Sequence, residues 1–186
     1  MKNPIFKKGI ITGLAAGLTC FIYIYILYLL GFNQFGRFKY MFIGIYAIFF
    51  VVGLWSFRQQ FGGLEWSKAL GLGLLINFFG SLTYFCVLYL FMAATPNNAI
   101  ERYRSEMLLL QKGNQEYLED EMRKSLKFDD ITTHDTLKEE LENLNKAFET
   151  FKNTEWTPGI MAVDQTFGFA GIGLFLAFLF SLIFKN

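Results

Sequence analysis

Four long apolar runs dominate the chain, and one long charged segment separates the third run from the fourth. A helix needs roughly 20 apolar residues to cross the hydrocarbon core of a bilayer. The remaining segments are too few to cover four such runs in a soluble protein. The pattern therefore predicts an all-α membrane protein with four transmembrane helices. The runs are residues 10–30, 40–57, 69–93 and 166–184.

The charged segment also has a helical pattern, because its apolar residues recur at spacings of three and four. We predict a first helix that runs to Leu126 with a bend at Gly113. A second helix is expected to start at a cap formed by Asp135 or Thr136, with Glu139 completing a capping box. The two apolar stripes are Ile100, Tyr103, Met107 and Leu110, and then Leu137, Leu141, Leu144, Phe148 and Phe151.

These elements predict three parts: the first three transmembrane helices, a charged helical hairpin outside the membrane, and the fourth transmembrane helix. Residues 129–134 are expected to form the turn of the hairpin. Pro96 and Pro158 disfavour continuous helix where the hairpin meets the membrane helices. The parts are residues 1–94, 95–157 and 158–186.

The Lys and Arg residues near the ends of the runs predict the orientation. With the N-terminus in the cytoplasm, six of them lie on the inner side and two in the short outer loop, as the positive-inside rule favours. Both termini are then cytoplasmic and residues 95–157 are periplasmic, with the protein in a bacterial inner membrane. The inner residues are Lys2, Lys7, Lys8, Arg58, Lys68 and Lys185, and the outer ones are Arg37 and Lys39.

Composition supports the assignment to membrane proteins, and it shows that the predicted hairpin is acidic. Of the 186 residues, 53% are hydrophobic and 19% are aromatic, which is not the composition of a soluble domain. Residues 95–157 carry nine basic and fourteen acidic side chains, so this segment is acidic. We expect the lipid bilayer and other membrane proteins as partners, and no nucleic acid.

Few residues are suited to chemistry. Cys20 and Cys86 lie inside apolar runs without a metal-ligand spacing, and we expect both to be small core residues. His134 is the only histidine, and with Asp129 and Asp130 it fits a solvated turn better than a metal site. Phosphate-binding, nucleophile-elbow and zinc-protease motifs do not occur in the sequence. We therefore expect no catalytic residue, cofactor or metal.

Two polar residues outside the hairpin lie in or next to predicted membrane helices, where a polar side chain needs a partner or water. Asn77 lies inside the third run, where its amide needs a partner; we expect it to pack against another helix, with a substrate contact as the alternative. Asp164 lies about one bilayer thickness from the inner end of the last run. We expect it to be hydrated at the outer interface, with ion binding or pairing to a partner protein as the alternative.

Small residues at spacings of four mark one face of the first run and one face of the last. Such faces let two helices approach closely. Their partner is either another helix of this chain or another subunit. The residues are Gly9, Gly13 and Gly17, and then Gly173, Ala177 and Ser181.

The polar stretch between the second and third runs predicts a cytoplasmic turn. Two basic residues flank it, two glycines allow the chain to reverse, a tryptophan anchors the next helix at the interface, and a serine caps that helix. These residues are Arg58 and Lys68, Gly62 and Gly63, Trp66, and Ser67. Glu65 is expected to pair with one of the basic residues, and Trp156 to act as a further interface anchor.

The same turn resembles a family of small bacterial membrane proteins with four membrane helices, domain of unknown function 4199. Beyond the turn, the matching features are Pro96 before a charged helical region and a Ser-Leu-Ile ending at Ser181 with the basic residue Lys185. The chain has Trp66 where the family pattern has Phe. The resemblance implies the same membrane fold and brings no established activity.

The sequence leaves three functions open. The first is a non-enzymatic assembly or accessory factor of the cell envelope, acting through helix packing and the acidic hairpin as a homo-oligomer or with another membrane protein. The second is an oligomeric transporter or channel subunit with Asn77 and Asp164 along its path. The third is an accessory subunit of a membrane glycosyltransferase.

Overall fold

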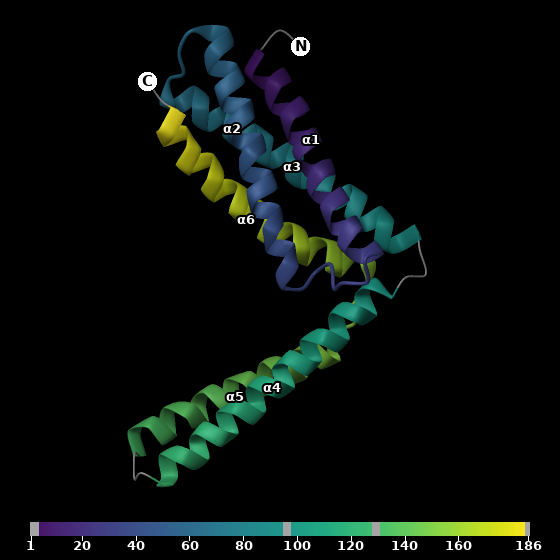
Figure 1. The fold of residues 1–186 in the computed structure, drawn as a ribbon, viewed down its shortest axis with the longest axis vertical. Coiled ribbons are helices and arrows are strands. Elements are labelled where there is room, and N and C mark those ends of the chain that lie inside the picture. Colours follow the sequence, from purple (N-terminus) through teal and green to yellow (C-terminus); the bar gives the residue numbers. More distant parts are fainter. Residues whose placement is uncertain (1–3, 95–97, 128–130, 185–186) are drawn as a thin grey trace. The chain divides into compact units, whose positions relative to one another are not determined.

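Six α-helices and one short 3-10 helix make up the described part of the chain, which contains no strand. The computed structural model describes residues 4–94, 98–127 and 131–184, without the side chains of residues 125–134. Two compact units emerge, one of Met1–Ala99 with Thr157–Asn186 and one of Ile100–Trp156. The helices are α1 (Pro4–Leu29), η1 (Arg37–Met41), α2 (Phe42–Phe61), α3 (Trp66–Ala94), α4 (Ala99–Lys127), α5 (Ile131–Asn153) and α6 (Pro158–Phe184) (Figure 1).

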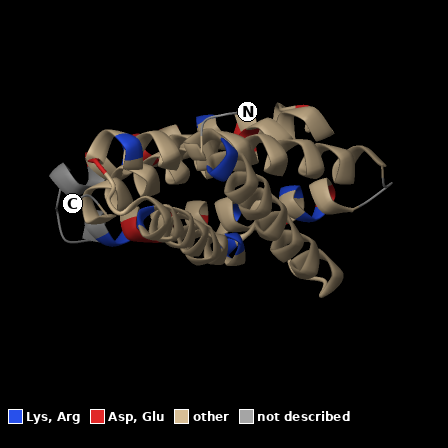
Figure 2. Ribbon diagram, turned by 90° about the horizontal axis from the view of Figure 1, so that it is seen from above, with Lys and Arg blue, Asp and Glu red and all other residues tan. Residues whose placement is uncertain are grey.

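The prediction of four apolar helices of membrane length is confirmed. The helices α1, α3 and α6, and the continuous stretch Arg37–Phe61 formed by η1 and α2, are each long and apolar enough to cross a membrane. Charged residues are sparse in these helices, and most of the ribbon in Figure 2 is accordingly tan. In the described residues, the protein is therefore helical, with four helices whose length and composition suit a membrane span.

The membrane helices begin earlier than the apolar runs do. The first starts at Pro4, and the last starts at Pro158 instead of residue 166. Proline is well suited to the first helical position, because its missing N–H would have no intrahelical partner there. The helix α6 therefore includes the polar residues that precede its apolar run, and Asp164 lies within the second turn of α6.

The helix α3 lies at the centre of the first unit and contacts α1, α2 and α6. Its closest approach to α1 is made where Gly13 and Gly17 face the backbone of Ile76 and Gly80. On the other side, Gly73 of α3 faces Ala177 of α6. Small side chains thus allow helices on both sides to pack tightly against α3.

The predicted start of the second charged helix is wrong. Because α5 begins at Ile131, the stretch 131–134 is helical, and Asp135 and Thr136 lie inside the helix instead of capping it. The backbone of His134 belongs to the first turn of α5, and the side chain of His134 lies outside the described residues. The positions of Pro96, Asp129 and Asp130 also lie outside them.

The helices α4 and α5 lie side by side in the second unit (Figure 1). The first of them is continuous through Gly113. A hydrogen bond joins the amides of Gln115 and Asn145 across the pair, and Arg104 Nη2 donates to the carbonyl of Lys152 at 2.9 Å. The second unit is therefore a pair of long charged helices linked by polar contacts.

Candidate functional site

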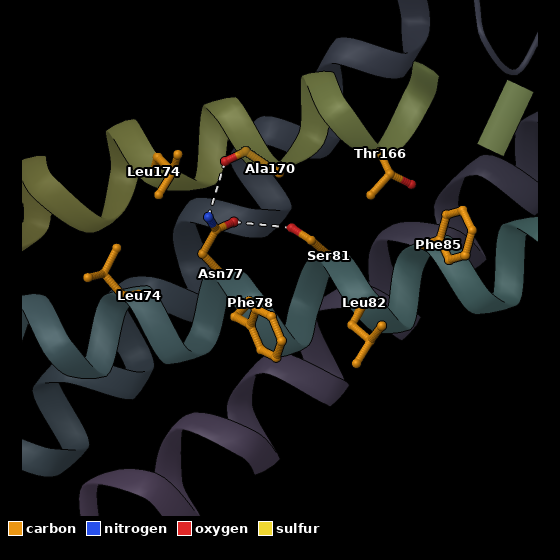
Figure 3. Close-up of a pocket in the computed structure, with 9 residues that line it drawn as sticks. All are labelled: Leu74, Asn77, Phe78, Ser81, Leu82, Phe85, Thr166, Ala170 and Leu174. Atoms are coloured by element: carbon orange, nitrogen blue, oxygen red, sulfur yellow. Dashed lines mark hydrogen bonds between the residues drawn. The ribbon is translucent and has the colours of Figure 1, made fainter. Parts of the chain in front are cut away.

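The side chain of Asn77 links three helices inside the first unit. Its amide nitrogen donates to the carbonyl of Ala170 in α6 at 3.1 Å, and its amide oxygen accepts from the hydroxyl of Ser81 in α3 at 3.2 Å (Figure 3). The amide oxygen also accepts from the hydroxyl of Tyr46 in α2 at 3.0 Å. These partners satisfy a polar group whose burial would otherwise be costly. The contacts are those of a packing residue, and all of them are made within this chain.

The position of Gly173 makes room for this amide. A Cβ atom at Gly173 would collide with Oδ1 of Asn77 and would lie 2.8 Å from the ring of Tyr46. Beside the amide, the ring of Phe169 stacks on Tyr46 at a centroid distance of 4.3 Å and on Tyr84 at 4.6 Å. Aromatic packing thus surrounds the hydrogen-bonded cluster.

The two small-residue faces are both occupied by α3. A Cβ atom at Gly9 would lie 2.6 Å from the Cβ atom of Leu75, and the next two glycines of that face meet the α3 backbone. On α6, Ala177 meets α3 and the buried Ser181 donates to the carbonyl of Phe178 at 2.7 Å. These faces therefore mediate contacts within the chain.

A chain of hydrogen bonds connects Asp164 to the start of the second span. The ammonium group of Lys39 donates to Gln165 Oε1 at 3.0 Å, and Gln165 Nε2 donates to Asp164 Oδ2 at 2.8 Å. Gln165 is buried, whereas Asp164 is exposed. The carboxylate of Asp164 is thus on the surface of the first unit, and its hydration at a membrane interface stays a prediction.

Gln34 and Gln165 are buried polar residues that the sequence analysis overlooked. Gln34 lies between α1 and η1 with 0% exposure, and neither of its amide atoms has a hydrogen-bond partner in the described part of the chain. No sequence pattern marks Gln34. The sequence does give a signal for Gln165. This residue directly follows Asp164 near the predicted outer end of the last membrane helix, and Lys39 is expected on the same outer side.

The turn between α2 and α3 reverses at one glycine. Gly62 has φ +72°, and its N–H bonds to the carbonyl of Arg58 at 3.0 Å, which ends α2. Lys68 pairs with Glu65 at 3.0 Å. The proposed cap at Ser67 is wrong, because α3 already begins at Trp66.

The cysteines and the acidic groups offer little for metal chemistry. Cys20 is buried, but the expectation that Cys86 is also a core residue is wrong, since its side chain is exposed on α3. Within the described residues, no three His, Cys, Asp or Glu side chains gather as metal ligands.

A groove of about 520 Å³ runs between α3 and α6 (Figure 3). Its walls are mainly leucine and phenylalanine side chains, and the buried hydroxyl of Thr166 has no hydrogen-bond partner in the described part of the chain. The groove thus lacks charged groups for recognising a polar ligand. The lining residues are Leu74, Asn77, Phe78, Ser81, Leu82, Phe85, Thr166, Ala170 and Leu174.

The α4–α5 pair exposes apolar side chains among its charges. Leu109 is 71% exposed and Tyr117 is 65% exposed, and Leu110, predicted to lie on the apolar stripe, is 53% exposed. Trp156 is held within the unit instead, where its indole donates to the carbonyl of Phe151 at 3.2 Å. The pair therefore presents a surface on which apolar and charged groups are mixed.

Charged residues near the far end of α4 form a local cluster. Lys124 Nζ lies 2.8 Å from Glu121 Oε1 and 3.9 Å from Asp120 Oδ2. The hydrogen bond to Glu121 raises the pKa of the Lys124 amine. Lys124 is thus already paired with acidic groups of its own helix.

Comparison with known proteins identifies one family. The family model described as a protein of unknown function (DUF4199) matches residues 11–186. No curated protein and no solved structure matches the chain. The match spans all four apolar helices together with α4 and α5.

Proposed function

Because the chain belongs to the DUF4199 family of proteins of unknown function, we propose a role from its surfaces: a non-enzymatic accessory factor of a bacterial inner membrane that binds another membrane protein through α4 and α5. The observation that carries this proposal is the exposure of Leu110 and Tyr117 on a charged helix pair. Exposed aromatic and aliphatic side chains beside polar groups are typical of protein interfaces.

The four apolar helices support the same proposal, because their candidate contact residues are already engaged within the chain. Their small-residue faces contact α3, and the amide of Asn77 is engaged by α2, α3 and α6. Asn77 therefore acts as a link between helices, which weakens the case for a transport pathway through it. The helix pair is then the better candidate for contact with another protein.

The proposed orientation places α4 and α5 on the periplasmic side and both termini in the cytoplasm. It is supported by the excess of Lys and Arg on the inner side, including the exposed Arg58 and Lys68 at the turn. A net negative segment is compatible with this location, because the positive-inside rule counts Lys and Arg in short loops.

Photo-crosslinking in native membranes tests the contact. A photoreactive amino acid at Leu110 or Tyr117 is expected to give a discrete adduct with another protein. The same amino acid at Ile48 or Val52, which are exposed on the apolar helix α2, serves as the matched control. Adducts from the α2 positions alone, or none at all, would contradict the proposal.

A further inference from the structure

A groove of about 500 Å³ lies along the α4–α5 pair. We infer that this groove is the docking site for an amphipathic helix of net positive charge on a partner protein, an inference that rests on the proposed contact function. The groove is lined by Asn114, Tyr117 and Leu118 of α4, and by Glu140, Asn143, Leu144 and Ala147 of α5.

The seam between the two helices is incompletely covered. The side chains of Leu118 and Leu144 line the groove and are only half-buried, as are Leu141 and Phe148 farther along α5. Two helices have only one contact face each, so apolar groups at the edge of the seam remain accessible to water. A third helix over the groove would bury them together with the exposed ring of Tyr117.

The shape of the groove suits a helix. Lining residues recur at spacings of three and four on both α4 and α5, so they form two ridges along the pair. An amphipathic helix fits between such ridges, and its apolar side chains at similar spacings pack against them. The small side chain of Ala147 in the lining leaves room for an anchor residue of the incoming helix.

Charge selects a basic occupant over a second copy of this chain. The unit Ile100–Trp156 has nine basic and fourteen acidic residues. Glu140 is the one charged residue of the groove lining, and Lys124, farther along α4, is already paired with Glu121. Two acidic pairs would repel each other, and a helix rich in Lys or Arg would be attracted.

Binding of designed peptides to the full chain tests this inference. The protein is placed in nanodiscs of zwitterionic lipid, and the probes are two amphipathic peptides of about 20 residues. Both carry leucines at the same positions, but one has lysine and the other glutamate on its polar face. We expect the lysine peptide to bind beyond its background on empty nanodiscs, with affinity that falls as salt rises, and the glutamate peptide not to bind.

Two exposed apolar residues give a matched pair of variants. Tyr117→Ser is expected to weaken binding of the lysine peptide by about tenfold or more, as for an interface anchor. Leu109→Ser removes a similarly exposed apolar group outside the groove and is expected to leave the affinity unchanged. Glu140→Lys should lower both the affinity and its salt dependence. Unchanged helix content by circular dichroism would show that each variant folds.

Several results overturn the inference. They are absence of binding by the lysine peptide, equal binding by the two peptides, and equal loss in Tyr117→Ser and Leu109→Ser. Efficient disulfide formation between two copies carrying Tyr117→Cys, unaffected by the lysine peptide, would assign the groove to a second copy. Crosslinks in native membranes without peptide binding would refute the inference alone, whereas absence of crosslinks would refute the proposed function.

Discussion

Asn77 and Gln34 are both buried amides, yet only Asn77 has hydrogen-bond partners in the described part of the chain. The sequence predicted a packing role for Asn77 because an amide in an apolar helix needs a partner. It did not identify the partners, since Tyr46 and Ala170 lie on helices far along the chain. A buried amide in a short loop, such as Gln34, leaves no periodic signal at all.

Replacing these two amides should change stability in opposite directions. Asn77→Leu leaves Tyr46 and Ser81 without their shared acceptor, and we expect the free energy of unfolding to fall by about 1–2 kcal/mol. Gln34→Met removes unpaired polar atoms at similar volume, so the free energy of unfolding should rise by up to about 1 kcal/mol. Equilibrium unfolding in mixed micelles measures both. A loss of stability in Gln34→Met would show that its amide is satisfied.

Adding a methyl group tests the close approach of α1 to α3. A Cβ atom at Gly17 would collide with the carbonyl of Gly80, so Gly17→Ala should cost about 1–3 kcal/mol of unfolding free energy. Gly171 lies in the middle of α6 with open space around its Cα atom, and Gly171→Ala should gain about 0.5–1 kcal/mol. The same unfolding assay compares them. Equal effects of the two variants would contradict the tight α1–α3 contact.

The existence of the apolar helices was predictable, whereas the faces that they bury were not. Length and hydropathy suffice for existence. A membrane helix is apolar all round, so hydropathy does not show which side faces the protein, and Cys86 was wrongly assigned to the core for this reason. Among the charged helices, the start of α5 was misplaced, because the helix already begins at Ile131, before the predicted cap at Asp135 or Thr136.

The turn between α2 and α3 depends on one left-handed glycine. Of its two glycines, only Gly62 has a positive φ. Gly62→Ala should therefore lower the free energy of unfolding by about 1–2 kcal/mol, since an L-residue is strained in that region. Gly63→Ala is the matched control and should have a smaller effect. A larger loss from Gly63→Ala would show that the reversal depends on the second glycine.

At the scale of the whole molecule, the unit of apolar helices and the unit of charged helices differ in what they bury and what they expose. The small-residue faces and Asn77 hold the four apolar helices together. The α4–α5 pair exposes its apolar side chains, its groove and its acidic residues. Sequence predicted two charged amphipathic helices from their periodicity. It did not predict the groove, because residues from two separate helices line it and only Leu144 among them belongs to a predicted stripe.

The proposed contact function and orientation require α4 and α5 to lie in the aqueous phase, across the membrane from the turn at Gly62. Cysteine labelling with a membrane-impermeant maleimide tests this requirement most directly, in a Cys86→Ala background where Cys20 remains buried. We predict that Glu119→Cys and Glu142→Cys label in intact spheroplasts, whereas Gln60→Cys labels only after permeabilisation. Labelling of Gln60→Cys in intact spheroplasts, with protection of the other two positions, would contradict the account.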